Sequence, residues 1–162
     1  NGSEIFTMPS NSSSQTEYFM RGGNDTVKVN STSQFLFAYI DGGDGHDTLQ
    51  FSAPWVLDLS QISNQMMDKV ENFEVFKVDL FGSFTTANTL TLDLQSLLDF
   101  SSADHKLFVS GTRIDTVDLL DFSDWTKSAA TTTIAGIAYY DWTNLNDANV
   151  HLYIQSAITQ VI

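Results

Sequence analysis

The chain lacks cysteine and has few positive charges, and both absences exclude particular kinds of binding site and partner. Its 162 residues include no cysteine and only seven lysines and arginines. Without cysteine the chain forms neither disulfides nor thiolate zinc sites. So few cations do not suit nucleic acid or an anionic membrane surface, both of which call for a basic face. No stretch approaches the roughly 18 apolar residues of a membrane span. We therefore expect no nucleic-acid partner and no membrane insertion.

Acidic residues, in contrast, are abundant, and most of them are aspartates. Twenty acids give a formal net charge of -13, and sixteen of the twenty are aspartates. Aspartate is favoured in turns and metal loops, whereas glutamate is favoured on solvated helices. Uncompensated charge of one sign opposes compaction, and bound divalent cations would relieve that repulsion. We therefore expect several calcium ions, which would stabilise the chain as disulfides stabilise many secreted proteins.

One segment, Gly42–Gln50, carries a specific calcium signature. It reads Gly-Gly-Asp-Gly-His-Asp-Thr-Leu-Gln and fits the nonapeptide G-G-x-G-x-D-x-U-x at every specified position, U being a large apolar residue. Glycine permits the backbone angles of the turn, and aspartate supplies the hard anionic oxygen that calcium prefers. The expected calcium ligands of this turn are Asp41, Gly43, Asp44, Gly45 and Asp47.

Weaker echoes of the same pattern lie on either side. Gly22–Val27 is a degraded copy that keeps a glycine, the aspartate Asp25 and the apolar residue. Gly111–Val117 keeps one glycine and Asp-Thr-Val, so Asp115 forms either a calcium ligand or a plain turn. Further along, Asp121 lies in an acidic segment that forms either a second calcium cluster or a solvated turn. We include all three aspartates among the candidate metal ligands.

Short apolar runs separated by polar turns predict an all-β fold. A hydrophobic content of 42% is enough for one domain with a core, which we assign to residues 1–162, with 1–16 as a polar lead-in and 17–162 as the calcium-binding β domain. Such regular short strands indicate a β-sandwich or a related solenoid. Because only two turns are well formed, we favour a calcium-stabilised sandwich carrying calcium turns. The expected strands include 27–29, 35–40, 49–51, 73–80, 89–94, 106–109, 116–120, 131–140 and 150–154.

One or two short helices are also expected. Leu59, Ile62, Met66 and Val70 recur at helical spacing, and Ser60 is positioned to cap that helix. A second helical turn is expected around residues 97–98.

A second candidate site combines aromatic rings with oxygen ligands near the C-terminus. Aromatic platforms beside carboxylates and amides suit calcium-dependent capture of sugars or peptide carboxylates. The alternative is a strand with core aromatics followed by an Asx-rich turn. The candidate ligand-binding residues are Tyr140, Asp141, Trp142, Asn144, Asn146 and Asp147.

The order of these motifs resembles one known family. The nonapeptide with Asp41 looks like the repeat-in-toxin (RTX) motif of secreted bacterial proteins. The segments 70–80 and 88–99, followed by Leu107–Gly111, Asp115–Val117 and Trp125-Thr126, resemble successive segments of giant RTX adhesins. The resemblance covers roughly residues 20–160. One departure is Thr112-Arg113-Ile114, where that family often has an acidic turn containing glycine, and this favours the plain turn at Asp115.

The resemblance implies a location and a function. RTX adhesins are exported by type I secretion, act at the bacterial cell surface in adhesion and biofilms, and carry peptide-binding and sugar-binding modules near their C-terminal end. We therefore expect an extracellular, monomeric module within a longer chain, which binds peptide termini or glycans through an exposed calcium. The alternative is a purely structural, calcium-folded spacer next to the secretion region. Catalysis by paired carboxylates was the third possibility, but the chain has neither a G-x-S-x-G elbow nor a zinc-protease motif, so we expect no enzyme.

Overall fold

The described part of the protein is built mainly from short β-strands. The computed structural model describes residues 2–9, 16–30, 39–52, 56–61, 70–73, 75–80, 86–100 and 105–162. These residues confirm the predicted all-β class. The strands are β1 (Ile5–Thr7), β2 (Glu17–Phe19), β3 (Thr26–Val29), β4 (Tyr39–Asp41), β5 (Thr48–Ser52), β6 (Val56–Asp58), β7 (Val70–Glu71), β8 (Val75–Asp79), β9 (Thr89–Leu92), β10 (Lys106–Ser110), β11 (Thr116–Leu119), β12 (Trp125–Ile134), β13 (Ile137–Asn144), β14 (His151–Gln155) and β15 (Gln160–Val161).

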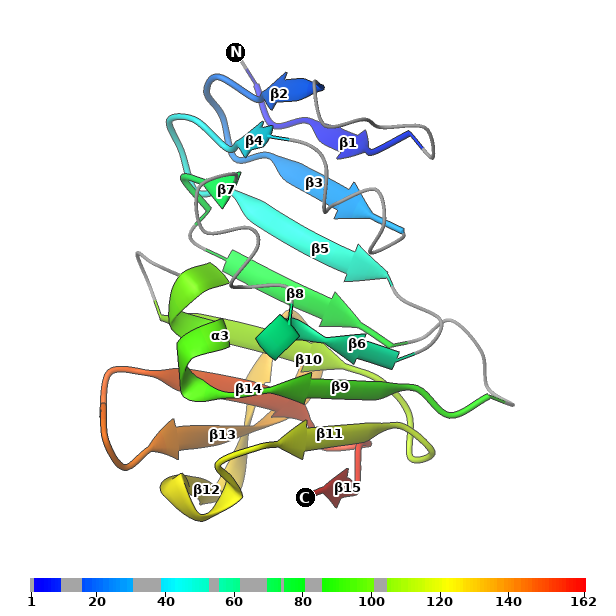
Figure 1. Ribbon diagram of the computed structural model, residues 1–162, viewed down its shortest axis with the longest axis vertical. Helices are drawn as coiled ribbons and strands as arrows, with labels where there is room; N and C mark the ends of the chain where they lie inside the picture. The colour runs from blue at the N-terminus through cyan, green and yellow to red at the C-terminus, as the bar shows by residue number, and fades with distance from the viewer. Residues whose placement is uncertain are drawn as a thin grey trace.

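The strands form one long sheet and two smaller ones. The long sheet has the order β1-β3-β5-β8-β10-β14-β13-β12; the others have the orders β15-β11-β9-β6 and β2-β4-β7. From β1 to β14 every pairing within the long sheet is parallel, and so are all pairings in the two smaller sheets. The chain alternates between the long sheet and a smaller one, so it winds into a solenoid whose coils descend from the N-terminus in Figure 1.

The expected sandwich is not confirmed. A sandwich of this kind has antiparallel strands. In the long sheet, by contrast, the strands from β1 to β14 pair in parallel, and β1, β3, β5, β8 and β10 follow one another in chain order, which is the arrangement of the related solenoid. The reason for the error is local. Alternation of apolar and polar residues reports which face of a strand is buried and does not report the direction of the neighbouring strand. Calcium stabilisation stays a prediction.

The hydrophobic core lies between the long sheet and the two smaller sheets. Alternate side chains of each strand point into it, as in β3, where Val27 and Val29 are buried, as predicted from their alternation with Lys28. Ile40 from β4 and Leu90 from β9 belong to the same cluster. Each fully buried aliphatic side chain contributes about 1.5–3 kcal/mol to the free energy of folding. This continuous core cluster therefore stabilises the stacking of the coils.

Two short helical segments are close to their expected positions. Helix α3 (Leu94–Phe100) contains the turn expected at 97–98, and the carboxylate of Asp93 caps it by accepting the Ser96 amide at 2.7 Å. Residues 59–61 are also helical; residues 62–69 lie outside the described ones. The expected cap, Ser60, lies inside that helix, and Asp58 accepts both the Ser60 hydroxyl and the Gln61 amide. No helix in the described part of the chain is long and apolar enough to cross a membrane.

A β-hairpin is appended to the C-terminal end of the long sheet. β12 and β13 pair antiparallel, with an irregularity between Lys127 and Thr131. The sequence predicts a single strand over 131–140, but the chain reverses at Ala135 and Gly136, which have φ values of 50° and 82°. Two successive residues with positive φ make the tight turn whose twist suits a hairpin. In Figure 1 this hairpin lies at the foot of the solenoid.

Candidate functional site

The three turns that precede strands β1, β3 and β5 of the long sheet stack on one another, and buried aspartates join them. We call these turns, residues 2–4, 21–25 and 42–47, the turn stack. Asp47 is fully buried, and its Oδ1 accepts the Asp25 backbone amide at 2.7 Å. Asp25 is also buried and accepts the Glu4 amide at 2.7 Å. Each carboxylate therefore links its own coil to the coil before it.

Glycine allows these turns to approach one another closely. Gly45 has a φ of +155°, and a methyl group placed on it would overlap the carbonyl oxygen of Gly23. Gly23 has a φ of +131°, and a methyl group there would lie 2.7 Å from the carbonyl oxygen of Gly2. No larger residue fits these positions. Glycine at positions 45 and 23 is thus explained by the contact between coils alone, with or without a metal.

The remaining acids of the nonapeptide have different surroundings. Asp41 accepts the Gly43 amide at 3.0 Å and the Asn72 side-chain amide at 2.7 Å, so its carboxylate closes the turn. The Asp44 side chain is exposed. Its backbone pairs with the turn of the preceding coil, donating to Arg21 at 2.9 Å and accepting from Gly23 at 3.0 Å.

The turn stack fits calcium in the kind of ligand that it offers. Calcium takes roughly six to eight hard oxygens, and this turn has carboxylate and carbonyl oxygens. One of them, Oδ2 of Asp25, is buried and has no hydrogen-bond partner among the described residues, which is costly for a charged group unless a cation is near. Within the described residues no group of three acidic or histidine side chains could hold a metal. Any calcium here would therefore rely on carbonyls beside Asp25 and Asp47.

The other two predicted metal ligands lie elsewhere. Asp115 precedes β11 in the four-stranded sheet, where its carboxylate accepts the amides of Thr112 at 2.7 Å and Asn88 at 3.0 Å. These bonds fit the plain-turn alternative, and a role of Asp115 as a calcium ligand stays a prediction. Asp121 is exposed and precedes the short 3-10 helix η1 (Phe122–Asp124). Neither residue joins the turn stack.

The predicted ligand-binding residues are divided between the two faces of β13. Tyr140 and Trp142 point to one face, where the Lys127 ammonium lies 3.6 Å from the Tyr140 ring centroid and 5.9 Å from that of Trp142. They line a small cavity of about 290 Å³. Asp141 points to the opposite face, where both of its oxygens lie 3.0 Å from Nδ1 of His151. The three residues therefore do not form one platform.

The asparagines and the aspartate that follow build the turn after β13. Asn144 is buried and accepts the Asn146 amide at 2.8 Å. The Asn146 side chain donates to Asp124 at 2.7 Å. Asp147 accepts the backbone amide of Asn149 at 3.0 Å. Most of these polar side chains are therefore occupied by hydrogen bonds that build the turn, which fits the Asx-rich turn of the alternative interpretation.

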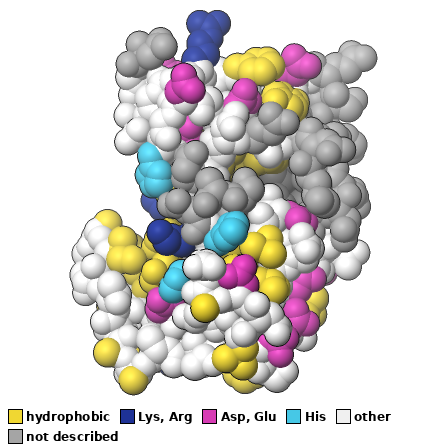
Figure 2. Space-filling model, turned by 90° about the vertical axis from the view of Figure 1, so that its left-hand side faces the viewer, with side chains coloured by type: hydrophobic (Ala, Val, Ile, Leu, Met, Phe, Trp, Pro, Cys, Tyr) yellow, Lys and Arg dark blue, Asp and Glu magenta, His cyan; other side chains and the backbone are white. Residues whose placement is uncertain are grey.

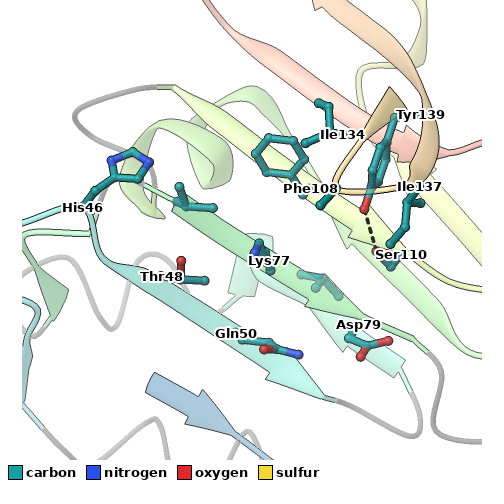
Figure 3. Close-up of a pocket in the computed structure, with 13 residues that line it drawn as sticks. His46, Thr48, Gln50, Lys77, Asp79, Phe108, Ser110, Ile134, Ile137 and Tyr139 are labelled. Carbon is teal, nitrogen blue, oxygen red and sulfur yellow. Dashed lines mark hydrogen bonds between the residues drawn. The ribbon is translucent and has the colours of Figure 1, made fainter. Parts of the chain in front are cut away.

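A groove on the outward face of the long sheet was not predicted. It has a volume of about 520 Å³ and lies between strands β5, β8 and β10 and the tip of the hairpin. Figure 3 shows the hairpin tip and Tyr139 on one side of it, and the polar side chains of β5 and β8 on the other. The lining residues are His46, Thr48, Gln50, Val75, Lys77, Val78, Asp79, Phe108, Ser110, Ile134, Ala135, Ile137 and Tyr139.

Aromatic rings form one end of this face. The rings of Phe108 and Tyr153 stack with centroids 4.8 Å apart and planes at 12°. Tyr139 meets Phe108 edge-on at 5.8 Å, and its hydroxyl lies 3.1 Å from that of Ser110 (Figure 3). The ring of His151 stacks on Tyr153 at 5.9 Å. One sequence signal could have found this surface, because alternation in β10 places Phe108 on the polar side of the strand.

Among the described residues of this face, Tyr153 has a clearly shifted pKa. Burial raises its pKa above the ordinary value of 10.0, and the negative charge of Asp141 raises it further. Because the folded state favours the neutral phenol, this stabilisation is complete below pH 10.0 and is lost as the pH rises through the folded pKa. We expect Asp141→Asn to lower the pKa of Tyr153. An absorbance titration, with Tyr153→Phe to assign the signal, measures this; an unchanged pKa would leave burial as the sole cause.

Comparison with models of protein families, with curated proteins and with solved structures finds no match to this chain. The turn stack and the groove are therefore interpreted from their own geometry and from the sequence patterns.

Proposed function

We propose that the chain is an extracellular ligand-binding module of a bacterial adhesin of the RTX type, exported by type I secretion. In this proposal calcium orders the solenoid, and the groove on the long sheet holds a glycan or peptide from another surface. The single observation that carries the proposal is the groove. It is an open hollow of about 520 Å³ with aromatic rings at one end and polar side chains along its floor, which is the usual composition of a binding site.

Calcium would act at the turn stack rather than at the ligand. Asp25 and Asp47, with backbone carbonyls of the same turns, would hold it. The bound ion supplies positive charge that offsets their buried carboxylates. His46 and Thr48 lie next to Asp47 in the chain and also line the groove, so order in the turn stack is passed directly to the groove wall. Ligand binding would therefore depend on calcium without any contact between the two.

The structural-spacer alternative has an observation in its favour. Six strands of the long sheet, β1 to β14, pair in parallel without interruption, and the aspartate links of the turn stack add to that ladder. A solenoid of this kind is stable through contacts between neighbouring coils and needs no ligand. The spacer accounts for the turn stack but gives no reason for the groove or for the rings that face it.

The test is a binding assay with a matched aromatic control. Calcium-loaded protein is titrated against short free-carboxylate peptides and simple glycans, with and without chelator. We expect Phe108→Ala to weaken binding about tenfold, since a buried aromatic contact is worth roughly 0.5–1.5 kcal/mol beyond its area. The control is Phe122→Ala, because Phe122 is 44% exposed and lies outside the groove. Full affinity in Phe108→Ala would place the ligand outside the groove. If the calcium-loaded parent protein binds none of the peptides or glycans, the structural-spacer role remains.

A further inference from the structure

The outward face of the long sheet carries a straight row of side chains across its parallel strands. The printed register pairs Lys28 with Gln50, Gln50 with Lys77, Lys77 with Phe108, and Phe108 with Tyr153. Neighbouring strands lie about 4.8 Å apart, and Lys28 and Lys77 are two strands apart, so the backbones of these two lysines are separated by roughly 10 Å. The row runs across the strands and passes through the groove at Gln50, Lys77 and Phe108.

Positive charge is concentrated on this face. Lys28, Lys77 and Lys106 all alternate with buried residues and therefore point outward from the long sheet. They are three of only seven basic residues in a chain that has twenty acids. His46 and His151 lie on the same side. Figure 2 shows histidine side chains together with basic ones (Lys or Arg) midway down one side of the molecule, next to hydrophobic and acidic ones.

The acids that face the row from the described strands are few. Asp79 is two residues further along β8 than Lys77 and pairs with Ser110, so it lies in the neighbouring row of the same face. Asp141 lies opposite Tyr153, but both of its oxygens are within 3.0 Å of the His151 ring nitrogen. The row itself thus contains two lysines, Lys28 and Lys77, and one acid at its far end, Asp141, whereas the chain as a whole has a net charge of -13.

We infer that the groove binds an anionic polysaccharide, one that carries carboxylates or sulfates; this rests on the proposed function. The apolar parts of the sugar rings would contact Phe108 and Tyr139, which line the groove, while Gln50 and Ser110 hydrogen-bond to hydroxyls and Lys77 and Lys28 meet the charges. A linear polymer suits a row that continues past both ends of the groove. Nucleic acid suits it less, because a denser polyanion would also meet the repulsion of a chain with a net charge of -13.

The test compares charged and neutral oligomers at constant calcium. Binding is measured for short oligogalacturonate, a heparin oligosaccharide, a neutral galactan oligomer, a free-carboxylate peptide and a single-stranded DNA oligomer, each at low and high salt. We expect one or both acidic glycans to bind, the neutral one to bind at least tenfold more weakly, and salt to reduce the affinity. The two acidic probes decide between carboxylate and sulfate.

Charge-removing variants locate the contact. Lys77→Gln is expected to weaken acidic-glycan binding up to about fivefold, as is usual for one exposed ion pair, and Lys28→Gln with Lys77→Gln more than either alone. Arg113→Gln is the matched control, since Arg113 is exposed in the turn before β11 and lies outside the groove. Lys77 is itself exposed, so its replacement leaves the fold intact.

The outcomes separate this inference from the function on which it rests. Equal binding of neutral and acidic glycans, or peptide binding that Lys77→Gln leaves unchanged, overturns the polyanion inference and keeps the binding module. Preferential binding of DNA overturns it as well. If no probe binds, the inference and the binding module both fail. An equal loss of affinity in Arg113→Gln and Lys77→Gln would mean that binding depends only on the net charge of the protein. That result also overturns the assignment of the contact to this row.

Discussion

Replacing Gly45 by alanine is expected to lower the free energy of unfolding by on the order of 3–5 kcal/mol. A methyl group at this position would overlap the carbonyl oxygen of Gly23, and the φ of +155° is one that side chains rarely adopt. The obstacle is backbone rather than a flexible side chain, so relief requires the two coils to separate. That movement would also stretch the bond between Asp47 and the Asp25 amide. Urea unfolding followed by circular dichroism measures the change.

Two other glycines of the chain serve as controls. Gly136 has a φ of +82° but no described atom within 4 Å of an added methyl group, so Gly136→Ala isolates the cost of the backbone angle, about 1–2 kcal/mol. Gly2 has neither a positive φ nor a close neighbour, and Gly2→Ala is expected to change stability by less than about 0.5 kcal/mol. If Gly45→Ala costs no more than Gly136→Ala, the two turns are not stacked as described.

Calcium is expected to raise the stability of the protein, and Asp47→Asn is expected to remove that increase. At about 100-fold excess over the dissociation constant, each site adds roughly 2.7 kcal/mol, which scanning calorimetry would register as a rise in Tm. Asparagine keeps the oxygen that accepts the Asp25 amide but loses the negative charge. Without calcium the variant should therefore stay within about 1–2 kcal/mol of the parent, so the hydrogen-bonding and metal-binding roles of Asp47 are separated.

Asp121→Asn is the matched control for the calcium experiment. It removes the same charge from an exposed position outside the turn stack, so its calcium-induced rise in Tm should equal that of the parent. A full calcium response in Asp47→Asn would move the ion away from the turn stack. No response in the parent protein would show that the turn stack is held by hydrogen bonds and glycine contacts alone.

Much of the local structure was predictable because its causes are local. The alternation of Val27, Lys28 and Val29 predicts one buried face, and β3 has it. The expected strands at 106–109 and 116–120 correspond to β10 and β11 within a residue. Two predictions are wrong although the sequence carries a local signal at each position. Gly136 marks the hairpin turn inside the predicted strand 131–140, and Asp58 precedes the Ser60 that was chosen as the helix cap.

The candidate site was only partly predictable. The nonapeptide located the turn of Asp47, since its glycines and aspartate are contiguous in the chain. Tyr140, Asp141 and Trp142 are also contiguous, but a strand sends alternate side chains to opposite faces, which separates them. The groove combines residues from β5, β8, β10 and the hairpin, and no pattern within one segment joins Gln50 to Lys77 and Phe108.

The sequence by itself determined the β class, the buried face of most strands and the position of the one complete calcium-type turn, because hydrophobic alternation and turn chemistry act over a few residues. Only the tertiary structure decided that the strands run parallel in a solenoid, that Asp47 reaches the amide of Asp25, and that lysines of separate coils form one row. Each of these depends on pairing between residues more than twenty positions apart, and that pairing is decided by how successive coils stack.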